Sequence, residues 1–292
     1  MSELYSRLFT LNPVLEEASR ARRKFFRSAG QPGQVLFYIV MLFILLIYIW
    51  LLFISTEGGA PSVPFILVAQ LTILTLALPI TIYGAISGER EKSTWDALVL
   101  TRLTPGQIVT GKLLWRINTM LIIMGLFLPL VLAGVYGGAH AAVGGTFTHD
   151  GTRSVASLIV NTELMTFFWG FLLLAFGLFV SSRTSRSVAS AAIAIITLLF
   201  TLVMCPALLN MVTSGFYFEN FMAHPFPWFI IHCNPYLVSV TMANQLVGQN
   251  SYTPPSGFSY GAFQIVLYLI LGIFFSFITY GGLKSSAGIA KN

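Results

Sequence analysis

Residues 88–112 read GEREKSTWDALVLTRLTPGQIVTGK, and we call this stretch the charged island. It opens with four charged residues of alternating sign, at positions 89–92, and it lies between two long apolar runs. Alternating charges need water or a protein partner, whereas apolar runs favour surroundings without water. The island therefore predicts a polar segment at the point where the chain leaves an apolar environment and returns to it.

The rest of the chain is dominated by apolar residues. Of its 292 residues, 56% are hydrophobic and 9% are charged, whereas soluble domains contain about 25% charged residues. A membrane-spanning helix needs about 20 mainly apolar residues, because its backbone polar groups must pair within the segment. Six stretches have this length, at roughly 35–55, 64–87, 113–136, 157–181, 188–212 and 262–283. The sequence predicts an all-α integral membrane protein with six transmembrane helices in a single domain, residues 1–292.

The basic residues predict the orientation of these helices. With six spans, 15 of the 16 Lys and Arg residues fall on one side, and only Arg153 falls on the other. The positive-inside rule then places both termini and the charged island in the cytoplasm. The net charge of +6 is accounted for by this topology and by contact with membrane lipids, so we expect no nucleic-acid partner.

Residues 12–28 predict an amphipathic helix on the membrane surface. Asn12 can cap its start, and Pro13 suits the first helical position. Basic residues follow toward its C-terminal end, where the helix dipole favours cations. Either lipid headgroups or a cytoplasmic protein partner could bind these side chains. The candidates for this contact are Arg20, Arg22, Arg23 and Lys24.

The charged island contains two helix signals. Trp95, Leu98, Val99 and Arg102 recur at the spacing of one helix face, which predicts a short amphipathic helix over residues 93–102. The alternative is a solvated loop that folds back on the bilayer. Residues 104–107, Thr-Pro-Gly-Gln, resemble a capping box with proline at the first helical position, which starts the helix leading into the third span.

Three polar residues inside the predicted spans are candidates for a translocation pathway. Gln70 lies in the second span, and Asn161 and Glu163 lie near the start of the fourth. Ionisable groups in membrane helices usually face the bundle interior or a wet cavity. Alternatively, the fourth helix starts later, and Glu163 lies at the membrane interface near the helix N-terminus.

The remaining segments predict no further site. Residues 213–261 are rich in aromatic residues but interrupted by prolines, which predicts short re-entrant or interfacial helices before the last span. Cys205 and Cys233 are expected to be inert thiols. His140, His149 and Asp150 lack compact ligand spacing, so no metal site is expected.

Sequence motifs of several enzyme classes are missing from the chain. It contains no G-x-x-x-x-G-K-[S/T] phosphate-binding loop, no H-E-x-x-H, no G-x-S-x-G and no zinc-ligand spacing of Cys and His. We therefore expect the chain to be no enzyme, to hold no cofactor, and to depend on another chain for any use of ATP. An intramembrane enzyme or cofactor scaffold is disfavoured, because no polar cluster in the spans could perform the chemistry.

Two parts of the charged island resemble the loop between helices 2 and 3 of type-2 ATP-binding-cassette (ABC) permeases. The first is Gly-Glu-Arg-Glu at 88–91 with the following Thr94-Trp95-Asp96-Ala97-Leu98, and the second is Pro105-Gly106-Gln107-Ile108 ending in Gly111-Lys112. Asn12-Pro13-Val14-Leu15 is similar to the start of the surface helix in many members. This chain has Lys92-Ser93 where glycine-based variants are common in the family, and Trp95 for the usual leucine.

The resemblance implies the membrane subunit of an ABC exporter in a bacterial inner membrane. The charged island would bind a separate nucleotide-binding ATPase subunit, which holds the ATP and magnesium, and a second permease subunit would complete a dimer. The residues implied in ATPase coupling are Gly88, Glu89, Arg90, Glu91, Trp95 and Leu98. The alternative is a membrane anchor that transmits the motion of an ATPase to an extracytoplasmic machine without transporting a substrate.

Overall fold

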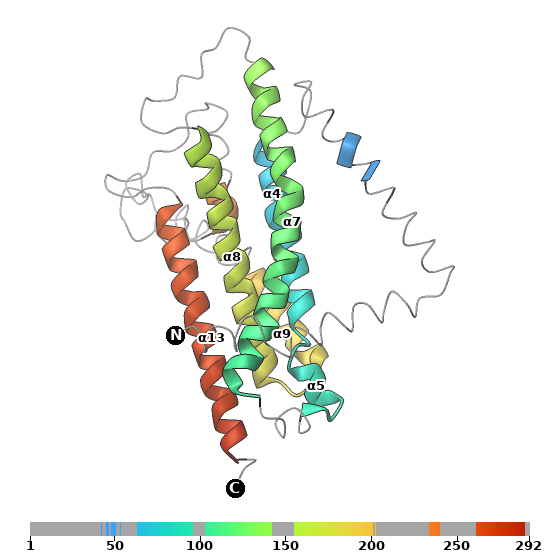
Figure 1. The fold of residues 1–292 in the computed structure, drawn as a ribbon, viewed down its shortest axis with the longest axis vertical. Coiled ribbons are helices and arrows are strands. Elements are labelled where there is room, and N and C mark those ends of the chain that lie inside the picture. Colours follow the sequence, from blue (N-terminus) through green and yellow to red (C-terminus); the bar gives the residue numbers. More distant parts are fainter. Residues whose placement is uncertain are drawn as a thin grey trace, which may run out of the picture.

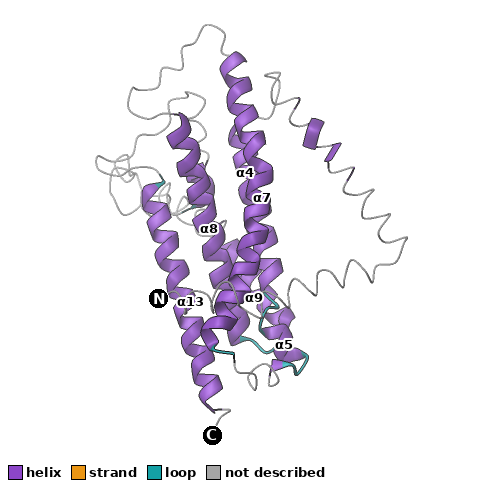
Figure 2. Cartoon of the chain, viewed as in Figure 1, coloured by secondary structure: helices purple, strands orange, loops and turns teal. Residues whose placement is uncertain are grey.

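The computed structural model describes residues 63–95, 103–141, 155–200, 202, 234–239 and 261–289, together with helical positions between 42 and 53. Within these ranges the chain is helical and contains no strand (Figures 1 and 2). The main elements are α4 (Val63–Ile82), α5 (Ser87–Glu91), α7 (Pro105–Ala141), α8 (Val155–Arg183), α9 (Ser187–Leu199) and α13 (Ala262–Ile289).

Four segments are long and apolar enough to cross a membrane: Phe65–Glu91, Pro105–Gly134, Ile159–Arg183 and Ala262–Ser285. They coincide with the predicted spans 64–87, 113–136, 157–181 and 262–283, and this is the architecture of an integral membrane protein. Helix α9 is a shorter apolar helix at the start of the predicted fifth span. Most of the remainder of that span, and most of the first span, lie outside the described residues, so six spans stay a prediction.

Helix α8 is the centre of the bundle. It contacts each of the other main helices named above, and in Figure 1 it runs between α13 and α7. In its apolar segment 67% of the residues are buried, against 22% in α13. Large apolar side chains cover the outward faces of the peripheral helices, among them Leu76, Leu126 and Phe277, as expected for surfaces in contact with lipid tails. The central position of α8 means that polar residues on it face other helices.

Two glycines mark close contacts between α8 and its neighbouring helices. A side chain at Gly170 would collide with Met120 Sδ of α7 and would press on Leu78 of α4. Gly272 of α13 likewise faces the ring of Phe171. Small residues let membrane helices pack backbone to backbone. At Gly170, therefore, α4, α7 and α8 are held together with no room for a methyl group.

The start of α7 confirms the predicted capping box. Gln107 N donates to Thr104 Oγ1 at 3.3 Å, and Gln107 Oε1 accepts from Thr104 N at 2.9 Å. Pro105 occupies the first helical position, where its missing N–H is not needed. The helix then continues without interruption to Ala141, past Pro129.

The second predicted span is wrong in one respect, because it is not one continuous helix. Helix α4 ends at Ile82, residues 83–86 form turns, and α5 follows from Ser87. Tyr83 N still donates to Pro79 O at 2.9 Å, but Ala85 N donates to Ile82 O at 2.9 Å, which is the tighter spacing of a 3₁₀ turn. The break places α5 at the lower end of the bundle in Figure 1, which we call the island end; the opposite end is the far end.

Several predicted elements lie outside the described residues. These are the surface helix 12–28, positions 96–102 of the predicted amphipathic helix, and most of the segment 213–261. Within that last segment, residues 235–239 are helical. Asn234 Oδ1 accepts from Tyr236 N at 2.9 Å at its start. A short helix in this segment was predicted, and its first turn is confirmed.

Candidate functional site

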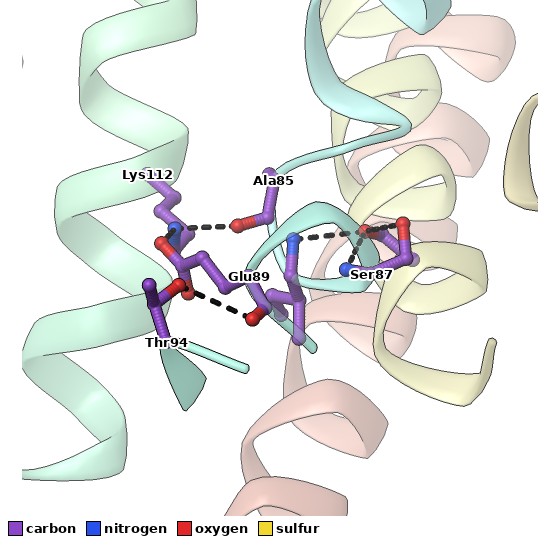
Figure 3. Close-up of polar contacts among 7 residues, drawn as sticks. Ala85, Ser87, Glu89, Thr94 and Lys112 are labelled. Atoms are coloured by element: carbon purple, nitrogen blue, oxygen red, sulfur yellow. Dashed lines mark hydrogen bonds and ion pairs between the residues drawn. The ribbon is translucent and has the colours of Figure 1, made fainter. Parts of the chain in front are cut away.

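The start of α5 is fixed to the bundle by a hydroxyl group of α8. Ser181 Oγ accepts from the backbone N–H of Ile86 at 2.9 Å and of Ser87 at 3.0 Å (Figure 3). Ser87 Oγ donates to Tyr83 O at 2.8 Å and lies 3.2 Å from Ser181 Oγ, so the Ser181 hydroxyl can donate its own hydrogen to Ser87 Oγ. Both serines are fully buried. A side chain 94 residues away in sequence therefore caps α5.

A lysine of α7 holds the middle of the same turn. Lys112 Nζ donates to Ala85 O at 2.5 Å and to Glu89 Oε1 at 2.6 Å (Figure 3). The Lys112 side chain is 13% exposed and that of Glu89 is 29% exposed. This ion pair is thus more shielded from water than a surface pair, and loss of either partner would leave a largely desolvated charge.

A carboxylate of α5 in turn caps α9. Glu91 Oε2 accepts from Ser187 N at 3.1 Å and from Ser187 Oγ at 2.5 Å. Arg186, which precedes α9, supplies no side-chain cap of its own. A negative charge at a helix N-terminus is favourable, because the free N–H groups and the helix dipole are positive there. The Glu91 side chain therefore ties the island to the first residue of α9.

Lys112, Ser181 and Ser187 together form what we call the clamp. They come from α7, α8 and α9, and each binds the segment Ala85–Glu91 through hydrogen bonds of 3.2 Å or less. The segment Ala85–Glu91 is consequently bonded to α7, α8 and α9 at the same time. The arrangement therefore joins the turn at Ala85–Glu91 to the rest of the bundle.

Beyond α5 the chain turns outward. Ser93 has a φ of 56°, in the left-handed region, and Thr94 N donates back to Glu89 O at 2.9 Å. The guanidinium carbon of Arg90 lies 5.2 Å from the centre of the Trp95 ring, within the range of a cation–π contact. Trp95 is half-buried and packs against the core cluster of α4, α7 and α8. Arg90 and Trp95 thus form a partly exposed surface that rests on the core.

The structure gives several of the predicted coupling residues partners within the chain. Glu89 binds Lys112, and Glu91 binds Ser187. A side chain at Gly88 would meet open space, so the fold itself does not require glycine there. Contact of these residues with an ATPase stays a prediction. The remaining predicted contact residues, Leu98, Arg20, Arg22, Arg23 and Lys24, lie outside the described residues.

The candidate pathway residues meet near the far end. Gln70 Nε2 of α4 donates to Glu163 Oε2 of α8 at 3.0 Å, and Gln70 is fully buried. Helix α8 begins at Val155, two turns before Glu163. The alternative of a helix that starts after Glu163 is therefore wrong. Asn161 is half-buried on the same helix.

Sequence reasoning missed the clamp. Ser181 and Ser187 lie at the ends of the short connection SSRTSRS between α8 and α9, which is too short for a domain and for which no role was predicted. Its density of hydroxyl groups, on the same predicted side of the membrane as the charged island, was the available signal. Lys112 lies within the island, but its spacing to Glu89 gave no indication of an ion pair.

Comparison of the sequence with models of protein families gives no match, and comparison with curated proteins gives no significant match. The likeness of the charged island to the ABC permease loop consequently rests on the residues of the island.

Proposed function

We propose that this chain is the permease subunit of an ABC exporter, which couples ATP hydrolysis by a separate ATPase subunit to efflux of a substrate. The observation that carries the proposal is the clamp. Lys112, Ser181 and Ser187 fix α5 to three membrane helices, as a coupling element requires.

The clamp suggests how the motion would pass through the chain. The ATPase subunit would bind the outward surface of the island, where Arg90 and Trp95 contact each other and Lys92 is exposed. Closure of two ATPase subunits around ATP and magnesium would displace the α5 turns of two permease subunits. The hydrogen bonds of the clamp would then carry the displacement into α7, α8 and α9.

A groove between α4 and α9 is the proposed contact surface for the substrate. It has a volume of about 220 Å³ and is lined by apolar residues of both helices: Pro79, Ile80, Tyr83, Ala191, Ala194 and Ile195. Ile80 and Ile195 are exposed at its edge. Ligand pockets commonly measure about 300–1,000 Å³, so a groove of this size would hold one apolar portion of a lipid-like or drug-like molecule. A second permease subunit would complete the cavity.

Two pairs of substitutions test the proposal by separating docking from transmission. Arg90→Ala with Trp95→Ala removes the outward surface, and we expect at least tenfold less ATPase subunit to co-purify with the tagged chain. Glu91→Gln with Ser187→Ala weakens the link between α5 and α9. We expect this variant to keep the ATPase subunit but to lower the substrate exported per ATP hydrolysed in membrane vesicles.

Lys284→Ala is the matched control, because Lys284 is an exposed lysine at the C-terminal end of α13, away from the island. It should leave both measurements unchanged. The partner must be identified by mass spectrometry as a chain with a phosphate-binding loop, and it must hydrolyse ATP with magnesium. The proposal fails if no such ATPase co-purifies with the unmodified chain, or if both double variants behave like the control.

A further inference from the structure

The polar pair of Gln70 and Glu163 contains more hydrogen-bonding capacity than the structure uses. One bond joins the two side chains, from Gln70 Nε2 to Glu163 Oε2 at 3.0 Å. The second oxygen of each side chain, Gln70 Oε1 and Glu163 Oε1, is buried and has no partner among the described residues. Buried polar atoms are nearly always paired, so two orphan oxygens in one contact need a physical explanation.

A single proton on Glu163 would give both unpaired oxygens a hydrogen-bond partner. An amide oxygen can only accept a hydrogen bond, and an ionised carboxylate can also only accept. With a proton on Glu163 Oε1, the carboxyl group gains one donor, and Gln70 Oε1 is the orphan acceptor on its partner side chain. The acid and the amide can then form a ring of two hydrogen bonds, N–H to O on one side and O–H to O on the other.

Among the described residues, the surroundings of this pair offer no charged group in place of the proton. Among the described residues of α4, α7, α9 and α13 that lie within the membrane-crossing stretches, the basic residues occur only toward the island end. The titratable side chains that pack near this part of α8 are tyrosines: Tyr268 against Trp169, and Tyr236 in the same core cluster. A metal cation is a poor alternative, because calcium takes about 6–8 oxygen ligands and magnesium about six.

We propose that Glu163 and Gln70 form a proton-binding site near the far end of the bundle. Uptake of one proton converts the Glu163 carboxylate to the neutral acid and joins α4 to α8 by two hydrogen bonds. Release of that proton to water leaves a negative carboxylate beside the amide oxygen of Gln70, and the contact between the two helices weakens. Glu163 is half-buried as a whole, although its Oε1 atom is buried. The site does not depend on the proposed export function.

Infrared spectroscopy of the purified chain in lipid vesicles tests the protonation directly. Neutral carboxylic acids give a C=O stretching band that carboxylates lack. We expect such a band at neutral pH in the unmodified chain, its absence in Glu163→Gln, and its loss as the pH is raised. Gln70→Leu should shift the band, because the acid loses its amide partner. Equal spectra of the unmodified chain and Glu163→Gln at neutral pH would mean that Glu163 is ionised, and the proposal would be wrong.

The stability of the chain against pH gives an independent readout. The folded state keeps the proton of Glu163, whereas the unfolded chain releases it above the ordinary range of glutamate. Stability should therefore fall as the pH rises, by up to about tenfold in the folded-to-unfolded ratio per pH unit while one proton is released. Glu163→Gln retains both hydrogen bonds through its amide and does not titrate. The fall in stability that comes from release of the Glu163 proton should therefore be missing from the pH profile of this variant.

Identical pH profiles for the unmodified chain and Glu163→Gln would overturn the proposal. If Glu163→Gln does not accumulate in membranes, the pH titration of the acid band in the unmodified chain and in Gln70→Leu decides. A band that Gln70→Leu leaves unshifted would exclude Gln70 as the partner of the acid.

Discussion

Both polar regions of the bundle contain glutamate side chains that need hydrogen-bond or charge partners, and the two regions supply different partners. At the island end, the carboxylates of Glu89 and Glu91 are matched by an ammonium group and by the N-terminus of a helix, and of their oxygens only Glu89 Oε2 is buried without a partner among the described residues. At the far end, the carboxyl group of Glu163 is matched by one amide, and an oxygen on each side is left without a partner. Both regions join helices that are distant in sequence.

The difference shows which region is suited to stay fixed. The clamp compensates charge with charge and caps backbone N–H groups, so any displacement of α5 breaks several bonds at once. The contact of Gln70 with Glu163 depends on one hydrogen bond in the described state, and it can gain or lose a second with a single proton. A rigid connection thus lies at one end of α8 and an adjustable one at the other.

The largest loss of stability is expected when the ammonium group of Lys112, the partner of Glu89, is removed. Lys112→Met leaves Glu89 partly buried without a counter-ion and Ala85 O without a donor, which makes the island resemble the far end. We expect a loss of about 2–3 kcal/mol in the free energy of unfolding, measured by unfolding in mixed detergent micelles.

Adding Glu89→Gln to Lys112→Met should recover part of the loss, because the uncompensated charge is removed. Lys284→Met controls for the change of an exposed lysine at the same end of the bundle. Equal stability of Lys112→Met and Lys284→Met would show that the ion pair contributes nothing.

A smaller effect is expected from Ser181→Ala, which leaves the N–H groups of Ile86 and Ser87 buried and unpaired. Unfolding measurements should show a loss of about 2 kcal/mol, the usual range for buried donors without acceptors. Ser182→Ala is the matched control, because the Ser182 hydroxyl donates only to Phe179 O within its own helix. Similar losses in the two variants would contradict the capping role of Ser181.

The smallest effect, and the only gain, is expected from Ser93→Gly. Its φ of 56° is unfavourable for a residue with a side chain, and glycine should raise the free energy of unfolding by up to about 1 kcal/mol. Ser185→Gly, in a connection without a positive φ, should instead lower stability slightly. A loss in both variants would show that the turn at Ser93 is not under strain.

Structural features that depend on residues close together in the sequence could be predicted. Four membrane-crossing helices followed from long apolar stretches, and the start of α7 followed from Thr104 to Gln107. Both depend on local rules, namely the length needed to cross a bilayer and the pairing of the first N–H groups of a helix. Gln70 and Glu163 do meet, but their role in a translocation pathway stays a prediction.

The clamp could not be predicted, because its partners are separated by 94 and 96 residues. A serine has no sequence signature that says which backbone N–H it will accept. The break at residues 83–86 was missed for the same reason. The apolar pattern continues through Ile86, and the turn is stabilised there by a hydroxyl group from α8 rather than by the local sequence.

The close contact at Gly170 gives α8 a fixed point about which the helix could tilt. At a rise of about 1.5 Å per residue, Gly170 lies about 16 Å from Ser181 and about 10 Å from Glu163 along the helix axis. Because Met120 and Leu78 lie against this point, we expect α8 to tilt about Gly170 rather than to slide. Any tilt moves the two ends in opposite directions, and the far end travels about two thirds as far as the island end. A pull on α5 would thus arrive at Glu163 reversed in direction and reduced in amplitude.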